Sequence, residues 1–276
     1  EQVIIIPRDP FRRDRLRMAT RFFSLSPVVA DPFPEMLRLV NELHAARPFD
    51  VVIAGTVIMA PYALALSGAT RILEEHNSGS RWMYERYQAQ TAPVSRLRCW
   101  VSWRKAAAYE ARLFPHFDLV TMVSEQDAAA SRTRVPTGAP PVQVLPNGVD
   151  CAQLRPGRAE PQPDTLVFSG ALTYHANYEA MQSFLEQVYP LIRAARPQVK
   201  LRITGKADGV DLTGLSLDES VTLTGFVEDI RSEIAGAQVS VVPIRSGGGT
   251  RLKILEAMAL GTPVVSTGKG AEGIAA

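Results

Sequence analysis

Short, continuous runs of apolar and β-branched residues recur along the chain, and they constrain its fold more than any other feature. Helical patterns separate most of these runs. Continuous rather than alternating apolar strands are typical of parallel sheets that helices cover on both faces. The runs are VIII (3–6), VVIAG (51–55), RILEEHN (71–77), LVTMVS (119–124), VQVLPNG (142–148), TLVFSG (165–170), LRITG (201–205), VTLTGF (221–226), VSVVPI (239–244) and PVVST (263–267). The pattern predicts an α/β protein built on parallel sheets.

A stretch rich in proline and charge, RPGRAEPQPD at 155–164, divides the runs into two series. Two such series joined by a linker predict two Rossmann-like, doubly wound domains, an N-terminal one at 1–154 and a C-terminal one at 165–276. Ligands of open parallel sheets bind beyond the carboxyl ends of the strands. We therefore expect the two domains to face a ligand-binding cleft.

The composition limits the classes of protein that the chain can belong to. Its 276 residues, 46% of them hydrophobic, suffice for two domains, and a net charge of +2 does not indicate a nucleic-acid partner. We interpret the two unpaired cysteines, Cys99 and Cys151, as reduced thiols of a cytoplasmic protein. Residues 51–70 carry no charge, but Gly55 and Pro61 interrupt them, which favours a strand, a turn and a helix over a membrane span.

Three consecutive glycines, Gly247, Gly248 and Gly249, precede a helix that is predicted to begin near Thr250. Glycine permits positive φ and lets a ligand approach the backbone without a Cβ atom in the way. Free amides at the start of a helix, together with the helix dipole, favour a bound anion. We therefore predict an anion site here; the alternative is a surface loop with solvated basic residues.

Charged residues on the same helix bear on this site. Arg251 and Lys253 lie in its first turn, where a cation is unfavourable unless an anion is bound. Glu256 falls between Leu252 and Leu260 on the helical wheel, and a carboxylate on an apolar face needs hydrogen-bond donors. A sugar or ribose diol would supply two donors, whereas the alternative is a salt bridge from Glu256 to Lys253 or to a neighbouring helix. The combination indicates a nucleotide-sugar site.

Several segments carry a resemblance to a known family. They are GGGTRLKILEAMALGTPVVSTGKGAEG (247–273), LVFSGALTYHANYEAMQSFLEQVYPLIRAARP (166–197) and VLPNGVD (144–150), with a weaker likeness at EEHN (74–77) and VSEQD (123–127). These segments resemble the retaining glycosyltransferases of family 4, which have the GT-B fold. The resemblance implies a C-terminal domain that binds a sugar nucleotide, with loop amides on the sugar and diphosphate and Glu256 on the ribose. It also implies an acceptor-binding N-terminal domain, with His76 as the catalytic candidate near the transferred sugar and Asn77 on the acceptor side.

The chain departs from the family's pattern at three positions. Gly248 stands where most members have a second glutamate, and Ala171 and Asn177 stand where many have an arginine and a lysine. Arg251 and Lys253 are then the natural substitutes for neutralising the diphosphate, with Lys206 as a third candidate. The predicted donor site is Gly170, Lys206, Gly247, Gly248, Gly249, Thr250, Arg251, Lys253 and Glu256.

The resemblance implies a function and a set of partners. The expected reaction moves a sugar from a nucleotide-sugar donor to a glycan, lipid-linked or small-molecule acceptor, as in polysaccharide biosynthesis. No residues have metal-ligand spacing, so we expect neither a metal nor a cofactor. The chain begins with Glu, and the likeness lacks the first strands of the N-terminal domain and the closing helices of the C-terminal one. We therefore expect a fragment.

Basic segments of the N-terminal domain raise the question of membrane contact. Residues 11–23 carry five arginines against one aspartate, and Trp100 and Trp103 lie beside Arg98 and Arg104. Either segment could rest on the anionic inner face of a membrane, and the alternatives are a solvated helix face and tryptophans packed against the sheet.

Other functions stay open. A non-catalytic sugar-nucleotide-binding module is credible because Gly248 replaces the second glutamate, and a GT-B epimerase is a further alternative. His76 could equally be a structural residue at a strand end. An NAD-dependent oxidoreductase is disfavoured because no G-x-G-x-x-G follows any predicted strand.

Overall fold

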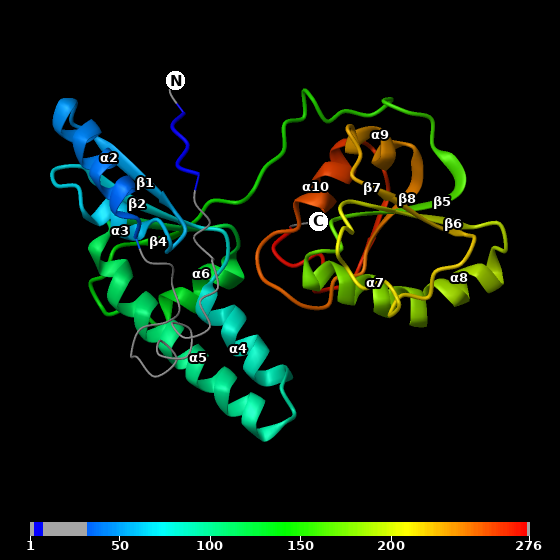
Figure 1. Cartoon of the computed structure of the whole chain (residues 1–276), viewed down its shortest axis with the longest axis horizontal. Helices are drawn as coiled ribbons and strands as arrows, with labels where there is room; N and C mark the ends of the chain where they lie inside the picture. The colour runs from blue at the N-terminus through cyan, green and yellow to red at the C-terminus, as the bar shows by residue number, and fades with distance from the viewer. Residues whose placement is uncertain (1–2, 8–31, 275–276) are drawn as a thin grey trace. The chain divides into compact units, whose positions relative to one another are not determined.

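The protein is an α/β protein with two parallel sheets, as the apolar runs predict (Figure 1). The computed structural model describes residues 3–7 and 32–274. The chain divides into two compact units, Glu1–Pro146 and Asn147–Ala276, each with its own sheet and core. This division lies before the predicted linker at 155–164, and the first strand of the second sheet begins inside that linker.

The first unit contains a four-stranded sheet in the order β1-β2-β3-β4, and all its neighbouring strands are parallel. Its strands are β1 (Val51–Gly55), β2 (Thr70–Glu75), β3 (Leu119–Met122) and β4 (Val142–Val144). Its helices are α2 (Pro34–Ala46), α3 (Ala60–Leu64), α4 (Gly79–Ala89), α5 (Pro93–Leu113), the 3₁₀ turn η1 (Phe114–His116) and α6 (Glu125–Arg132). The core forms where Leu73, Val120 and Met122 of the sheet meet Phe114 and Ala60.

The second unit contains a five-stranded parallel sheet in the order β7-β6-β5-β8-β9. Its strands are β5 (Gln162–Ser169), β6 (Lys200–Thr204), β7 (Val221–Gly225), β8 (Ala237–Val242) and β9 (Val264–Ser266). Its helices are α7 (His175–Gln187), α8 (Tyr189–Ala195), α9 (Ile230–Ala235) and α10 (Leu252–Ala259). Figure 1 shows α7 and α8 on one face of this sheet and α9 and α10 on the other. Burial is concentrated in the central strands β6, β5 and β8, whereas the outer strands β7 and β9 have no fully buried residue.

The two apolar segments near the start of the chain, 3–6 and 51–70, take different structures. The uncharged stretch 51–70 forms β1, a turn and α3, as predicted, and among the described residues no helix is both long enough and apolar enough to cross a bilayer. The apolar run at 3–6 was predicted to be a strand, and this is wrong. It is irregular and mostly exposed, because no neighbouring strand among the described residues pairs with it. The basic segment 11–23 lies outside the described residues.

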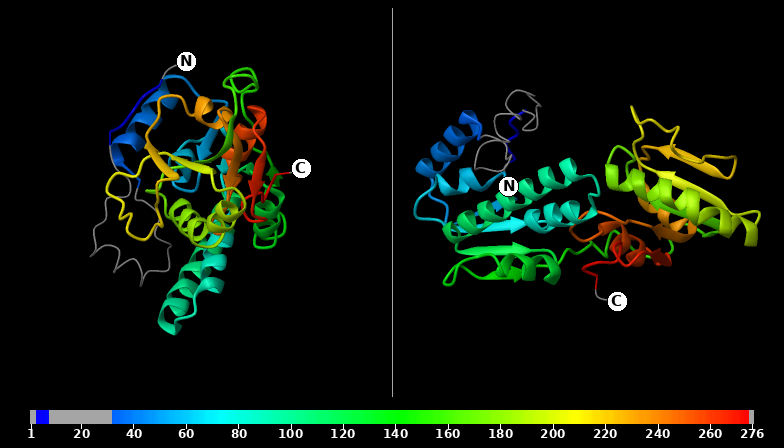
Figure 2. Two further views of the ribbon diagram at one scale, coloured as in Figure 1. Left: turned by 90° about the vertical axis from the view of Figure 1, so that its right-hand side faces the viewer. Right: turned by 90° about the horizontal axis from the view of Figure 1, so that it is seen from below.

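The helices α4 and α5 pair along their lengths and extend beyond the end of the first sheet (Figure 2). Serine side chains start two helices of this unit. The Ser78 hydroxyl accepts from the Arg81 amide at the start of α4, and the Ser124 hydroxyl accepts from the Asp127 amide at the start of α6. Both cysteines are free thiols, with Cys99 half-buried on α5 and Cys151 exposed at the start of the second unit.

Candidate functional site

The candidate site lies in the second unit, at the carboxyl ends of β5 and β8. From β5 the chain adds β6 and β7 on one side of the sheet and then returns to add β8 and β9 on the other. The loops that leave β5 and β8 therefore diverge, which opens the crevice where sheets of this kind bind ligands. A cavity of about 700 Å³ lies there. Its walls include Gly170, Gly205, Phe226, Glu228, Gly248, Thr250, Arg251, Lys253 and Glu256.

The three glycines before α10 have different roles. Gly247 and Gly249 have φ angles of 101° and 76°, which side-chain-bearing residues rarely adopt. Gly248 and Thr250 line the cavity, so the backbone approaches any occupant at these two positions. The positive φ predicted for the three glycines is therefore needed at the first and the last of them.

Arg251 holds this glycine loop together. Its Nη2 donates to the Gly247 carbonyl at 2.8 Å, and its Nη1 donates to the carbonyls of Gly248 and Gly249. Arg251 also precedes α10 as its N-cap residue rather than lying in the first turn. In this arrangement the terminal N–H groups of its guanidinium satisfy loop carbonyls, and the predicted contact with a diphosphate stays a prediction.

Lys253 is the cation that the fold desolvates at the cavity wall. Its Nζ donates to Asn177 Oδ1 at 3.2 Å and lies 4.1 Å from the centre of the Phe168 ring. Burial, reinforced by the neighbouring Arg251 charge and opposed by Glu256, lowers the pKa of Lys253 to about 8. A cation with so few compensating partners is suited to receiving an anion.

Gly170 makes room for this arrangement. A Cβ atom at Gly170 would lie 2.6 Å from Lys253 Nζ and 2.8 Å from Asn177 Nδ2. Asn177, in the first turn of α7, is fixed in turn by donating to the Ala171 carbonyl at 2.9 Å. Glycine at the end of β5 therefore lets the lysine of one helix reach the asparagine of another.

Glu256 lines the cavity from the middle of α10, but it is half-buried rather than buried as predicted. The reason is that α10 has an exposed side, on which Leu252 and Met258 lie, and Glu256 borders the open cavity. Among the ion pairs of the described residues, none joins Glu256 to Lys253. A direct salt bridge between these two residues is therefore not seen, although the Glu256 carboxylate lies close enough to favour the charged form of Lys253.

Lys206 does not join the cavity wall. It is exposed, and Gly205 lines the cavity in its place. Sequence reasoning missed Phe226, which follows β7 and lines the cavity although it is 73% exposed. Its position as the last residue of the predicted run 221–226 was the available signal, because the strand-end rule that selected Gly170 applies equally to it.

In the first unit, His76 and Asn77 follow directly after β2. His76 is exposed and Asn77 is half-buried. The perturbed residue is their neighbour Glu75, whose pKa is raised to about 8 by burial and, secondarily, by the Glu110 carboxylate. Its Oε1 is buried without a hydrogen-bond partner. Nothing in the sequence pattern distinguishes Glu75 from the half-exposed Glu74 beside it.

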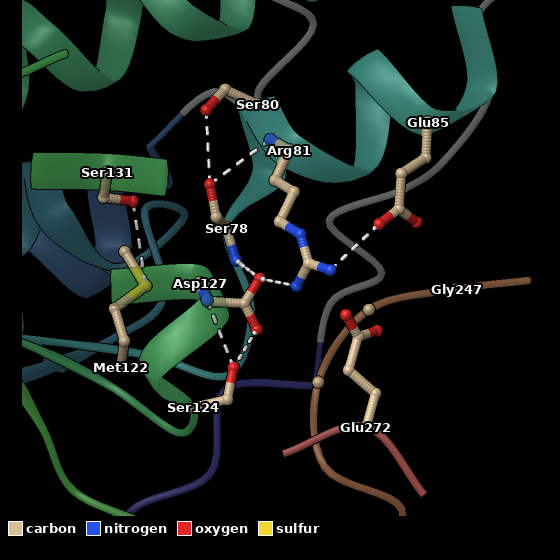
Figure 3. A network of polar contacts seen from close by, with 12 residues as sticks. Ser78, Ser80, Arg81, Glu85, Met122, Ser124, Asp127, Ser131, Gly247 and Glu272 are labelled. Carbon is tan, nitrogen blue, oxygen red and sulfur yellow. Dashed lines mark hydrogen bonds and ion pairs between the residues drawn. The ribbon is translucent and has the colours of Figure 1, made fainter. Parts of the chain in front are cut away.

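A polar network fixes the chain that leaves His76 (Figure 3). Asp127 accepts from the Ser78 amide at 3.2 Å and from the Ser124 hydroxyl at 2.8 Å, and Arg81 lies 3.3 Å from its Oδ1. Glu110 of α5 accepts from the Ser80 amide at 2.8 Å. Burial raises the pKa of Glu110, although the hydrogen bonds from Ser80 oppose the shift. The network ties α4, α5 and α6 together at the carboxyl edge of the sheet.

The first unit thus offers an edge with an exposed histidine, and the second offers a cavity with a loop of glycines and a desolvated cation. Among residues 3–7 and 32–274, no group of three or more histidine, cysteine, aspartate or glutamate side chains could hold a metal ion. Parallel-sheet units with a crevice at a topological switch point define a class of nucleotide-binding folds.

Sequence comparison identifies the family within this class. The profile of glycosyltransferase family 4 matches residues 1–153, and that of glycosyl transferases group 1 matches residues 163–276. The chain belongs to glycosyltransferase family 4. A search of curated protein sequences finds no significant match.

Solved structures agree on the fold. Sucrose-phosphate synthase from Thermosynechococcus elongatus superposes with a TM-score of 0.64 at 18% identity, over 86% of this chain and 61% of that one. Trehalose 6-phosphate synthase from Burkholderia multivorans superposes with a TM-score of 0.61 at 14% identity, over 94% of this chain and 64% of that one. HepE from Anabaena, in complex with UDP and glucose, superposes with a TM-score of 0.58 at 17% identity, over 86% of this chain and 64% of that one. The predicted GT-B fold is confirmed, and the chain spans less than two thirds of the length of each of these structures.

Proposed function

We propose that the chain transfers a sugar from a nucleotide-sugar donor to an acceptor with retention of anomeric configuration, and that it needs no metal or cofactor. The observation that carries the proposal is the desolvated Lys253 beside the glycine loop, in a cavity at the start of α10. A diphosphate is the anion that this combination suits, because backbone amides and one cation can share its charge. The complex of HepE with UDP and glucose supports the same ligand class.

Each part of the donor has a candidate partner. Lys253 and the amides around Gly248 and Thr250 would hold the diphosphate, and Glu256 would accept from the ribose hydroxyls. With Lys253 taking up the charge of the leaving diphosphate, catalysis has an electrostatic source that requires no divalent ion. Retention is proposed because the segments of the donor domain resemble those of retaining glycosyltransferases, and His76 is the proposed catalytic residue on the acceptor side.

The acceptor, the cellular location and membrane contact belong to the same proposal. A glycan, lipid-linked or small-molecule acceptor is proposed on the first unit, beside Asn77. The two free thiols favour action in the cytoplasm. Peripheral membrane contact is proposed through the first unit.

Calorimetry with UDP, GDP and ADP, with NAD as the comparison, tests the donor class. Glu256→Gln keeps the shape of the side chain but weakens charge-assisted bonds to the ribose, so affinity and turnover should both fall about tenfold if ~1.5 kcal/mol is lost. Because Glu256 is half-buried, the melting temperature should change little. A destabilised variant with unchanged affinity would place Glu256 in a structural role.

A labelled donor tests the reaction itself. Transfer with retained configuration, undiminished by a chelator, supports the full proposal, whereas turnover that stops in chelator and returns with magnesium or manganese would overturn metal independence. Gly248, in place of the second glutamate, favours one other function, a sugar-nucleotide-binding module that does not catalyse. Nucleotide binding without any transfer would establish that module, and an epimerised donor without acceptor product would indicate an epimerase.

A further inference from the structure

The helix α5 carries an apolar stripe on its exposed side. Val94, Leu97 and Trp100 are 72%, 61% and 42% exposed. With 100° of rotation per residue, the three fall within an arc of about 120° on the helix surface. They therefore form one continuous strip on a helix that, together with α4, extends beyond the sheet (Figure 2).

Arginines border this stripe on both sides. Arg96 and Arg98 are exposed and lie about 40° outside its two edges, next to Trp100 and Val94 respectively. Arg104 continues the stripe one turn further along and is also exposed. Residues 86–109 contain five basic residues and no acidic one, although the whole chain has a net charge of only +2. The positive charge is thus concentrated around the exposed apolar residues.

Aromatic contacts hold part of this surface in place. Trp103 lies 4.8 Å from Tyr84 and 6.0 Å from Tyr87 of α4 between ring centres, so it packs on the neighbouring helix rather than on the sheet. The guanidinium of Arg96 stacks over Tyr87 at 4.9 Å, and that of Arg104 over Trp103 at 5.7 Å. Arg96 and Arg104 are therefore positioned before any partner arrives, which lowers the entropy lost on docking.

The charge pattern selects one kind of partner. A second copy of the chain would bring like charges face to face, which opposes self-association. A nucleic acid would satisfy the arginines but leave Val94, Leu97 and Trp100 exposed. A surface with apolar residues flanked by cations fits an anionic lipid bilayer, in which the apolar side chains enter the acyl boundary and the arginines meet the phosphates.

We propose that α5 docks the chain on an anionic membrane surface through Val94, Leu97 and Trp100, with Arg96, Arg98 and Arg104 at the level of the lipid phosphates. This inference deepens the peripheral membrane contact of the proposed function, and it does not require transferase activity, because it rests on the exposed side of α5 alone.

Sedimentation with vesicles tests the proposed membrane docking of α5. One set of vesicles is pure phosphatidylcholine, and the other is phosphatidylcholine with one third phosphatidylglycerol. The full chain should bind only the anionic vesicles and should be released by salt. The double variant Arg96→Gln with Arg98→Gln should bind about tenfold or more weakly, and so should Val94→Ser with Leu97→Ser. The matched control is Leu191→Ser on α8 with Arg196→Gln at its C-cap, where Leu191 is 71% exposed, and it should bind like the unmodified chain.

Tryptophan fluorescence gives a second readout. Emission should shift to the blue on anionic vesicles, and Trp100→Phe should remove the shift. Circular dichroism and UDP affinity, measured on every variant, separate docking from folding and from the donor site. The proposal would be overturned if both α5 double variants still bound anionic vesicles, or if the unmodified chain bound neutral vesicles equally well. It would also be overturned if the chain formed a dimer that Val94→Ser with Leu97→Ser dissociates.

Discussion

Lys253 combines two properties that seldom occur together in a lysine. Its ammonium group is desolvated enough to lower its pKa to about 8, yet it borders a cavity open to a ligand. The asparagine that anchors it occupies the position where many family members carry a lysine. The amine of Lys253, which comes from α10 rather than from α7, is therefore the first positive charge to test for diphosphate binding.

Replacement of Lys253 by methionine keeps most of the side chain's length but removes its charge. Loss of a charge-assisted hydrogen bond, worth about 1.5–3 kcal/mol, should weaken diphosphate binding at least tenfold. Isothermal calorimetry with UDP and GDP measures this. Lys206→Met is the matched control, because Lys206 is exposed and outside the cavity wall, and its affinity should not change. Equal affinities for the two variants would refute the role of Lys253.

The lowered pKa of Lys253 also predicts a pH dependence of binding. Near pH 8 part of the free protein has lost the proton on this amine, and a bound diphosphate favours the charged form. Binding should therefore take up a proton, and affinity should fall as the pH rises above about 8. Calorimetry at pH 8.5 in two buffers of different ionisation enthalpy should give different heats. In Lys253→Met the two heats should agree; agreement in the unmodified chain would count against the linkage.

For single residues, the sequence predicted which side chains line the cavity better than it predicted the contacts that each one makes. Gly248, Thr250, Lys253 and Glu256 were expected and line the cavity. The engagement of Arg251 by carbonyls of its own loop depends on loop geometry that residue types do not encode. The raised pKa of Glu75 depends on its burial and, secondarily, on the charge of Glu110, 35 positions further along the chain, and such tertiary effects leave no local pattern.

Among the elements, the loop before α10 connects backbone conformation to function most directly. Gly247 has a φ of 101°, and alanine there would be strained by roughly 1–2 kcal/mol. Gly247→Ala should therefore distort the loop that Arg251 holds and weaken UDP binding several-fold. Gly248→Ala provides a comparison without positive φ, and its effect should be steric and felt only by the ligand. A Gly247→Ala variant with normal melting temperature and normal affinity would contradict this account.

Strands were predicted well because the signal was local. Continuous apolar runs became β1 to β9, since a parallel sheet covered by helices selects apolar residues, and burial is strongest in the central strands β3, β5, β6 and β8. The run at 3–6 has the same composition and yet is no strand, because a strand needs a neighbour to pair with. Element boundaries also shifted, as in α10, which begins at Leu252 rather than near Thr250.

For the whole molecule, Glu75 predicts how stability depends on pH. Its pKa is raised from 4.5 to about 8, so between these values the folded state holds a proton that the unfolded state has released. The stability contributed by this group is present below pH 4.5 and is lost as the pH rises through 8. Glu75→Gln should therefore raise the melting temperature at pH 8 and leave it nearly unchanged at pH 4.5.

Thermal unfolding followed by circular dichroism measures this difference. Glu74→Gln is the control, because neighbouring residues of a strand point to opposite faces and Glu74 is only half-buried. It should show no comparable rise at pH 8. An equal gain for Glu75→Gln at both pH values would mean that the carboxyl group does not titrate in this window.

The two free thiols have a practical consequence for measuring motion. Cys99 belongs to the first unit and Cys151 to the second, and they are the chain's only cysteines. A donor dye on one and an acceptor dye on the other would report the distance between the units by energy transfer, with no engineered residue. Titrating a sugar nucleotide into such a doubly labelled sample would show directly whether occupying the second unit moves the first.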